Sequence, residues 1–238
     1  MDIVRLSLAD GAAAARGIAV IIDVFRAFTC EPLLFACGAD RIVLEGDISR
    51  CLAWKDTAGA ILVGEHNELP IDGFDLTNSP SLILRNGAAM FEGRTVVHRT
   101  TSGVTGALAA LAHAERVYLA SYLTATATAA VIRAEAPAVV SIVAMGIRSK
   151  APAPEDERCG DYIASLLTGA PYDHLAAVAE IIGHETAQKF LRGDKAHLPK
   201  EDPVFCLQRD LFGFALEARV TADGVEAVRV YPKGSSQD

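Results

Sequence analysis

A carboxylate and a guanidinium follow the first strongly apolar run of the chain. The run Ile18–Ile22 ends in Asp23, and Arg26 comes three residues later, where an Ala- and Leu-rich helical pattern begins. In open α/β sheets the ligand crevice lies beyond the carboxyl ends of the strands, so both side chains should face it. A carboxylate beside a guanidinium suits a bound cation and an oxyanion. The alternative is that Asp23 only caps the helix or pairs with Arg26.

A second set of polar side chains follows the apolar run Ile61–Val63. Glu65 comes just after this run, and Asp75, Asn78 and Ser79 precede the next helical pattern. Asn78 or Ser79 could simply cap that helix. Capping does not explain why Glu65 and Asp75 also lie at the presumed edge of the sheet, so both are candidates for the site.

A loop rich in hydroxyl groups connects a third strand pattern to an Ala-rich helical pattern. It reads Arg99-Thr100-Thr101-Ser102-Gly103. Free N–H groups and the helix dipole favour an anion at a helix N-terminus, and the three hydroxyls add donors. The loop is therefore a candidate phosphate cradle, although no G-K-[ST] of a Walker A motif follows. The alternative is an ordinary Ser/Thr N-cap.

Further acidic residues begin a helical pattern that follows two prolines. Glu155 and Asp156 lie in its first turn, where acidic side chains ordinarily complement the helix dipole. Upstream, Arg148 and Lys150 follow the strand pattern Val139–Ala144 and could meet an anionic substrate.

Several common hydrolase signatures do not occur. The sequence has no D-x-D after a strand, no G-x-S-x-G and no H-E-x-x-H, and its six histidines are scattered. The five cysteines form no C-x-x-C pair, which disfavours zinc and indicates buried free thiols. Oxygen ligands without His or Cys suit a hard cation, so Mg²⁺ is the expected metal.

Composition excludes several classes of partner. The chain has 22 Lys and Arg against 30 Asp and Glu, a net charge of −8, and no basic run, which argues against nucleic acid. No apolar stretch approaches the roughly 20 residues that span a bilayer, and no signal peptide is evident. We expect a cytoplasmic protein without membrane contact.

Strand and helix patterns alternate over the first two thirds of the chain, which is typical of parallel βαβ units. Expected strands are Ile18–Asp23, Arg41–Leu44, Ala60–Gly64, Arg94–Arg99, Arg116–Ala120 and Val139–Ala144. Expected helices between them are Ala27–Cys37, Ser49–Thr57, Ser79–Asn86, Gly103–His113 and Leu123–Glu135.

Beyond Pro154 the pattern changes to consecutive helices, around 155–167, 171–182 and 185–191. Two strand patterns, Phe214–Val220 and Val225–Tyr231, then flank an Asp-Gly hairpin turn. The prediction is an α/β layered fold around a large mixed, mainly parallel sheet with helices on both faces. We expect one domain over 1–238, in which the end of the chain either adds antiparallel strands or forms a C-terminal subdomain from about 155. The last residues, 233–238, should be frayed.

Taken in order, six segments resemble the 2-phosphosulfolactate phosphatase family, Mg²⁺-dependent acid phosphatases known from coenzyme M biosynthesis. The segments are Ile22–Thr29, Gly64-Glu65, Gly73–Pro80, Arg99–Leu108, Pro154–Gly160 and Glu201–Asp210. The resemblance implies an α/β fold around a mixed sheet and a phosphatase that hydrolyses 2-phosphosulfolactate or a related small, anionic phosphate ester. The sequence leaves open whether the chain forms a homodimer.

Residue by residue, the resemblance assigns roles to the positions singled out above. It implies catalytic roles for Asp23, Arg26, Glu65 and Asp75, substrate binding by Asn78, Ser79, Thr100, Thr101 and Gly103, and metal binding by Asp23, Glu65, Glu155 and Asp156. Arg99 and Ser102, which belong to the same loop, are also expected to bind substrate. Asp202 and Asp210 match acidic positions of the family. Which carboxylate is nucleophile, base or metal ligand stays open.

The anion loop departs from the family pattern. Ser102 stands where the family usually has Asn, and Val104 where it usually has Thr. The carboxylates are retained while these anion-reading side chains differ. Two alternatives to the named reaction follow: a phosphatase for a different small phosphate ester, and a binding protein that holds a phosphorylated metabolite without cleaving it.

Overall fold

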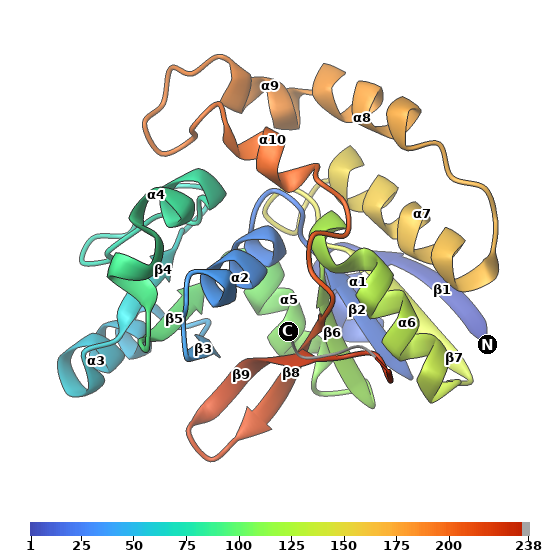
Figure 1. The fold of residues 1–238 in the computed structure, drawn as a ribbon, viewed down its shortest axis with the longest axis horizontal. Coiled ribbons are helices and arrows are strands. Elements are labelled where there is room, and N and C mark those ends of the chain that lie inside the picture. The colour runs from blue at the N-terminus through green and yellow to red at the C-terminus, as the bar shows by residue number, and fades with distance from the viewer. Residues whose placement is uncertain (235–238) are drawn as a thin grey trace.

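A computed structural model describes residues 1–234; residues 235–238, the end of the segment expected to be frayed, lie outside the described part. Within residues 1–234 the chain forms one nine-stranded mixed sheet with helices on both faces (Figure 1). The strands are β1 (Asp2–Ser7), β2 (Ile18–Ile22), β3 (Arg41–Leu44), β4 (Ile61–Gly64), β5 (Thr95–Arg99), β6 (Arg116–Ala120), β7 (Val139–Ala144), β8 (Ala215–Thr221) and β9 (Gly224–Val230).

Ten α-helices occur in the described residues. They are α1 (Leu8–Ala14), α2 (Ala27–Ala36), α3 (Ile48–Ala58), α4 (Pro80–Phe91), α5 (Gly103–Ala110), α6 (Ala125–Glu135), α7 (Pro154–Thr168), α8 (His174–Gly183), α9 (Glu185–Leu191) and α10 (Asp202–Cys206), with a 3₁₀ turn, η1 (Tyr122–Thr124), before α6. The predicted fold class is confirmed.

The sheet consists of two parallel groups joined by an antiparallel hairpin. Its strand order is β1-β7-β2-β6-β8-β9-β3-β5-β4. Strands β1, β7, β2 and β6 run parallel, as do β3, β5 and β4. The β8–β9 hairpin pairs antiparallel with β6 on one side and with β3 on the other. The chain therefore ends by adding antiparallel strands, one of the two expected alternatives, and it adds them in the middle of the sheet.

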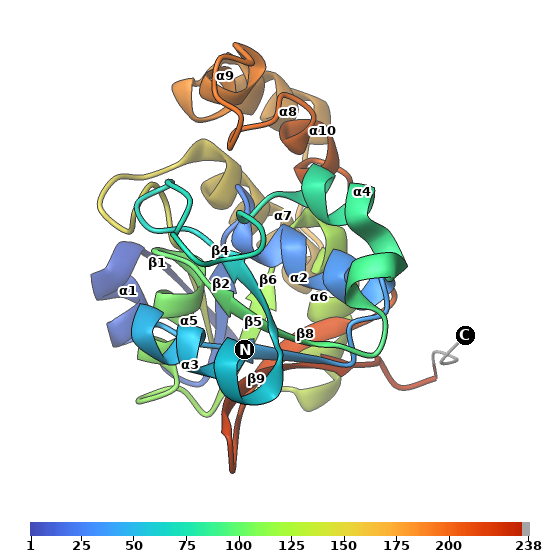
Figure 2. The same cartoon turned by 90° about the vertical axis from the view of Figure 1, so that its left-hand side faces the viewer.

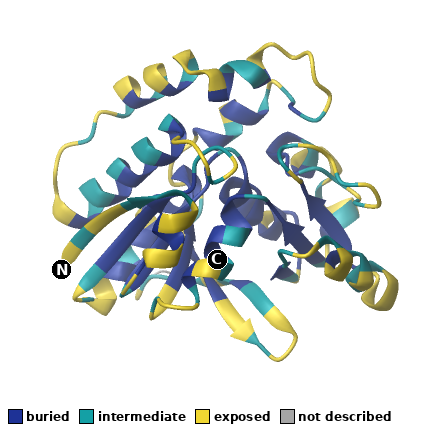
Figure 3. Cartoon of the chain, turned by 180° about the vertical axis from the view of Figure 1, so that it is seen from behind, coloured by how far each residue is buried: buried dark blue, intermediate teal, exposed yellow. Residues whose placement is uncertain are grey.

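Both faces of the sheet are buried, which explains why its central strands are continuously apolar. In β2, Ala19 and Ile21 pack with α1 and α5 on one face, while Val20 and Ile22 pack with α6 and α7 on the other. Figure 3 shows the strands as mostly buried, whereas the tip of the β8–β9 hairpin is exposed. All five cysteines are buried and free, as expected.

Helices α8, α9 and α10 gather at one end of the molecule. Figure 2 shows them at the end opposite the β8–β9 hairpin tip. Helices α7, α8 and α9 follow one another in contact, and α10 contacts α4 and α9. Whether the segment from about 155 is a subdomain stays a prediction. None of the helices in residues 1–234 is both long and apolar enough to cross a membrane.

Candidate active site

A single cavity collects the loops that follow β2, β4, β5 and β7, and α9 with the loop after it closes one side. Its empty volume, including the part open to solvent, is about 540 Å³. The predicted site residues that line it are Asp23, Arg26, Glu65, Asn78, Thr101, Ser102, Glu155 and Asp156. The structure thus brings together residues from all four segments that the sequence singled out.

Asp23 lies at the centre of these contacts. Its Oδ1 accepts a hydrogen bond from the backbone N–H of Ala27 at 3.1 Å, and its Oδ2 accepts one from that of Gly103 at 2.8 Å. Burial and, to a smaller extent, the negative charge of Glu65 raise the pKa of Asp23 to about 6, although these two hydrogen bonds act to lower it. Asp23 accepts the hydrogen bond of the first N–H of α2, although Arg26 is the N-cap residue of that helix, and Asp23 forms no ion pair with Arg26.

Two carboxylates from the first turn of α7 face the same cavity. Asp156 accepts hydrogen bonds from the backbone N–H groups of Val24, at 2.7 Å, and Gly146, at 2.8 Å. Burial, together with the charges of Asp23 and Glu155, raises the pKa of Asp156 well above its usual value. Burial also raises the pKa of Glu155 to about 7. Asp23, Glu155 and Asp156 are all buried, so their negative charges repel one another with little screening.

The predicted phosphate cradle binds the protein's own carboxylates. The N–H of Thr101 donates to Glu65 Oε1, and the N–H of Gly103 donates to Asp23 Oδ2. The loop therefore fixes two carboxylates at the cavity wall. Ser102 also lines the cavity, and neither its hydroxyl nor its N–H is bonded within the described residues. Ser102 is the donor of this loop that remains free for an anion.

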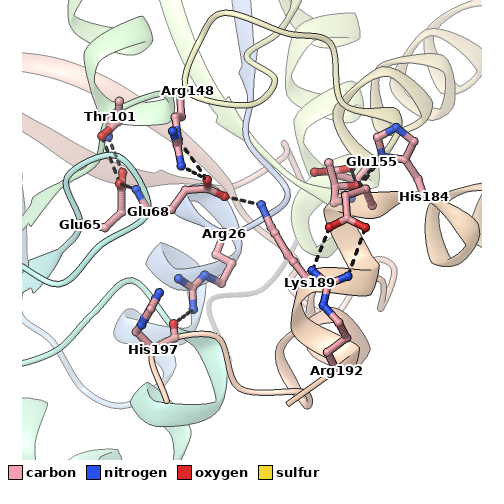
Figure 4. Close-up of polar contacts among 12 residues, drawn as sticks. Arg26, Glu65, Glu68, Thr101, Arg148, Glu155, His184, Lys189, Arg192 and His197 are labelled. Carbon is pink, nitrogen blue, oxygen red and sulfur yellow. Dashed lines mark hydrogen bonds and ion pairs between the residues drawn. The ribbon is translucent and has the colours of Figure 1, made fainter. Parts of the chain in front are cut away.

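Arg26 is held by a buried ion pair with a residue far along the chain. Its Nη1 lies 2.7 Å from Asp202 Oδ2 and 3.1 Å from the backbone oxygen of His197 (Figure 4). Its guanidinium also lies over the ring of Phe190, 5.1 Å from the ring centre. Its Nε and Nη2 bond to no described residue, which leaves them available for an anion in the cavity.

The same acidic partner organises the start of α4. Asp202 Oδ1 accepts hydrogen bonds from the Ser79 hydroxyl at 2.9 Å, and from the N–H and the hydroxyl of Ser81 at 3.0 and 2.7 Å. Ser79, predicted to bind substrate, is buried away from the cavity and caps α4. The C-terminal Asp210 holds α6 and Tyr162 instead.

Four other predicted residues lie behind the cavity wall or outside the cavity. Asp75, predicted to be catalytic, does not line the cavity: its Oδ1 pairs with Lys55 at 2.6 Å and its Oδ2 accepts from the N–H of Leu62 at 2.9 Å. The loop returns Asp75 to the flank of β4, so it fastens that loop. Arg99, Thr100 and Gly103 also do not line the cavity; they hold the loops that do.

Asn78 reaches the cavity from a buried polar chain. Its Oδ1 lies 2.9 Å from His98 Nε2, and His98 Nδ1 lies 2.9 Å from Glu31 Oε1. His98 and Glu31 are fully buried, so His98 is part of the interior of β5 and of this row of polar contacts. These contacts fix the orientation of the Asn78 amide.

Sequence reasoning missed two charged residues of the cavity, Glu68 and Lys189, and assigned no definite role to Arg148. Glu68 pairs with both Arg148 and Lys189 (Figure 4). Burial by itself would raise the pKa of Glu68, but the hydrogen bonds from Lys189 and Arg148 outweigh it and lower that pKa. No local motif marks Glu68 or Lys189, since each lies inside an ordinary polar loop or helix.

Comparison with known proteins supports the family resemblance found in the sequence. The sequence profile of the 2-phosphosulpholactate phosphatase family matches residues 6–218. The chain belongs to this family. Its members are named as phosphatases, which are phosphoric monoester hydrolases.

Individual relatives carry the same name, "Probable 2-phosphosulfolactate phosphatase". The protein of Bacillus subtilis (strain 168) is 31% identical over 206 residues, 85% of this chain and 87% of that protein. That of Caldicellulosiruptor saccharolyticus is 32% identical over 219 residues, covering 84% of this chain and 88% of that protein. That of Deinococcus radiodurans is 37% identical over 130 residues, covering 54% and 53%.

Proposed function

We propose that this chain hydrolyses the phosphate ester of a small acidic hydroxy acid, with 2-phosphosulfolactate as the first candidate, and that it uses Mg²⁺. The observation that supports the proposal most is that one cavity is lined by buried carboxylates that repel one another, those of Asp23 and Asp156 among them, and by Arg26 and Ser102. A role in coenzyme M biosynthesis belongs to this proposal and rests on the family resemblance, and a place in the cytoplasm belongs to it as the expectation from sequence composition.

The acidic residues fit a metal that takes few protein ligands. Within residues 1–234, no three His, Cys, Asp or Glu side chains form a ready-made ligand set. Mg²⁺ does not require one, because it is usually bound by one or two carboxylates with water and substrate phosphate. Asp23 and Asp156 would hold it, with Glu155 and Glu65 close enough to raise the pKa values of these two groups. When bound, Mg²⁺ polarises the phosphoryl oxygens and offsets the charge of the ester.

The donors of the cavity suit the phosphoryl group. Arg26 keeps Nε and Nη2 free, and Ser102 offers an N–H and a hydroxyl. Arg26 is preorganised, because Asp202 and Phe190 fix its guanidinium before substrate arrives. Donors fixed in advance stabilise the charge of the transition state without reorganising during the reaction.

Glu155 is suited to carry a proton. Its pKa of about 7 lies near neutral pH, where a general acid or base is most effective. Its Oε2 accepts a hydrogen bond from the Thr186 hydroxyl at 2.8 Å, which fixes the carboxyl group. Glu155 can therefore take a proton from water or give one to the leaving oxygen.

The test is phosphate release from a panel of esters with Mg²⁺ and with excess EDTA. The panel contains 2-phosphosulfolactate, 2-phospholactate, phosphoglycolate and a sugar phosphate. We expect release from the first two, and loss of release in EDTA. Full turnover in EDTA would refute the metal, and a preference for the sugar phosphate would refute the acidic substrate. Thermal stabilisation by the esters without any release would identify a binding protein instead.

A further inference from the structure

Glu68 connects two cations from distant parts of the chain across the cavity. Its Oε2 lies 2.8 Å from Arg148 Nη2 and 3.0 Å from Arg148 Nε, and its Oε1 accepts a hydrogen bond from Lys189 Nζ (Figure 4). Glu68 belongs to the loop after β4, Arg148 to the loop after β7, and Lys189 to α9. All three line the cavity.

The two cations differ from Arg26 in how they are neutralised. Arg26 is paired with Asp202, which is fully buried and outside the cavity lining. Within the described residues, Arg148 and Lys189 have ion pairs with Glu68 alone. The side chain of Glu68 is 30% exposed, so it can leave its partners and be solvated at once. Another anion can therefore replace it at the same two cations.

Both loops of this contact carry residues in a conformation that side chains disfavour. Asn67 and Glu68 have φ of 52° and 69°, and Arg148 and Ser149 have φ of 52° and 56°. Left-handed residues other than glycine are costly, and they gather at ligand clamps and switch regions. The closed contact is thus formed by two strained loops, which favours a rearrangement when Glu68 is displaced.

We propose that Arg148 and Lys189 form a second anion subsite, which binds the acidic group of the substrate, and that Glu68 occupies this subsite until the substrate displaces it. This rests on the proposed function, because the ligand is a phosphate ester with a further carboxylate or sulfonate. Such a group presents the same oxygens to the two cations as Glu68 does. An ester without it cannot replace Glu68, so the contact selects for acidic esters.

The test compares three variants on two esters with Mg²⁺. One ester, 2-phosphosulfolactate, has additional acidic groups, and the other, p-nitrophenyl phosphate, has none. With Arg148→Gln or Lys189→Met, the KM for 2-phosphosulfolactate should rise by about tenfold or more, the usual effect of losing one charged hydrogen bond. With Glu68→Gln it should fall several-fold, a gain that misfolding cannot produce. The KM for p-nitrophenyl phosphate should change by less than about twofold, because that ester does not reach the subsite.

The C-terminal end of α9 also provides a matched control variant. Arg192 follows α9 and forms an exposed pair with Glu185, 2.8 Å apart, outside the cavity lining. Arg192→Gln removes a cation of the same region, and it should leave both KM values unchanged. If the KM for 2-phosphosulfolactate rose equally in Arg148→Gln, Lys189→Met and this control, the effect would come from the net charge of the protein, and the subsite would be overturned.

Calorimetric titration with sulfolactate separates this proposal from the proposed function. Sulfolactate carries the carboxylate and the sulfonate but no phosphate. In one outcome, wild-type protein releases no phosphate from 2-phosphosulfolactate, but the affinity for sulfolactate still decreases from Glu68→Gln to wild type to Lys189→Met. The subsite then stands and the proposed function fails. If phosphate is released and all these affinities and KM values are equal, the subsite is refuted and the reaction stands.

Discussion

Gly103 and Asp23 lie 80 residues apart in the chain and touch where the carboxyl ends of β5 and β2 meet. A Cβ atom on Gly103 would lie 2.6 Å from the Cβ of Ala27 and 2.8 Å from Asp23 Oδ2. No side chain fits between them. Gly103 therefore allows the two parallel groups of strands, which are joined only through β8 and β9, to bring their polar ends into one site.

Gly103→Ala should separate these two ends. We expect kcat to fall by about 100-fold, because displacing a reacting carboxylate by roughly 1 Å has an effect of that size. Overpacking should also lower the free energy of unfolding by about 1–3 kcal/mol, measured by urea denaturation. Gly183→Ala is the control, since nothing lies within 4 Å of a Cβ there. An unchanged kcat in Gly103→Ala would show that Asp23 is not held by this contact.

Asp23→Asn should remove activity more than stability. We expect kcat/KM to fall by about 10³-fold or more. The amide oxygen keeps one of the two backbone hydrogen bonds and the other is lost, while losing the charge relieves repulsion with Glu65. Because these two effects oppose each other, the melting temperature should change little. Asp75→Asn, outside the cavity, should retain turnover. A destabilised Asp23→Asn with measurable turnover would make Asp23 a structural cap.

Stability should depend on pH in the sense opposite to that of ordinary salt-bridged carboxylates. The folded pKa values of Asp23 and Glu155, about 6 and about 7, lie above their usual 3.8 and 4.5. The folded chain therefore binds more protons than the unfolded chain between these values, and its free energy of unfolding should fall as pH rises through them.

Melting temperatures in EDTA and in Mg²⁺ check this dependence. In EDTA the melting temperature should decrease from about pH 5 to about pH 7.5, and Mg²⁺ should restore more of it at the higher pH, where the carboxylates are ionised. Asp23→Asn should flatten both trends. A melting temperature that rises with pH in EDTA would contradict the raised pKa values.

Asp202→Asn should destabilise the fold, because it leaves the buried Arg26 without a countercharge. We expect the free energy of unfolding to fall by about 3–5 kcal/mol, the usual cost of breaking a buried ion pair. The neighbouring Glu201 offers the control: it pairs with Arg85 at 3.6 Å on the surface. Glu201→Gln should cost less than about 1 kcal/mol. Equal effects in the two variants would mean that burial of Arg26 does not matter.

Local sequence patterns predicted most elements of the fold, because continuous apolar runs produce strands buried on both faces. Strands β3, β6 and β7 have the predicted limits, and most other limits differ by one or two residues. Strand β1 was missed because its apolar residues Ile3, Val4 and Leu6 neither form a continuous run nor alternate strictly with polar ones. The strand order could not be predicted, since nothing local indicates that β8 and β9 insert between β6 and β3.

The candidate site was predictable where polar residues follow strands directly. Asp23 and Glu65 come straight after β2 and β4, and both line the cavity. Asp75 lies outside the cavity because its loop doubles back onto β4, which the local sequence does not indicate. The pairs Arg26–Asp202 and Glu68–Lys189 span 176 and 121 residues, and their formation depends on helices that cover the site. Only the tertiary structure reveals such partners.

The position of the β8–β9 hairpin has a consequence for how the protein is made. Ribosomes synthesise chains from the N-terminus, so residues 215–230 emerge after the other seven strands of the sheet. Until then, the β1-β7-β2-β6 and β3-β5-β4 groups share no strand, and β6 and β3 each present an open edge. The nascent chain thus carries two unfinished sheets until residues 215–230 have emerged and paired with both of them.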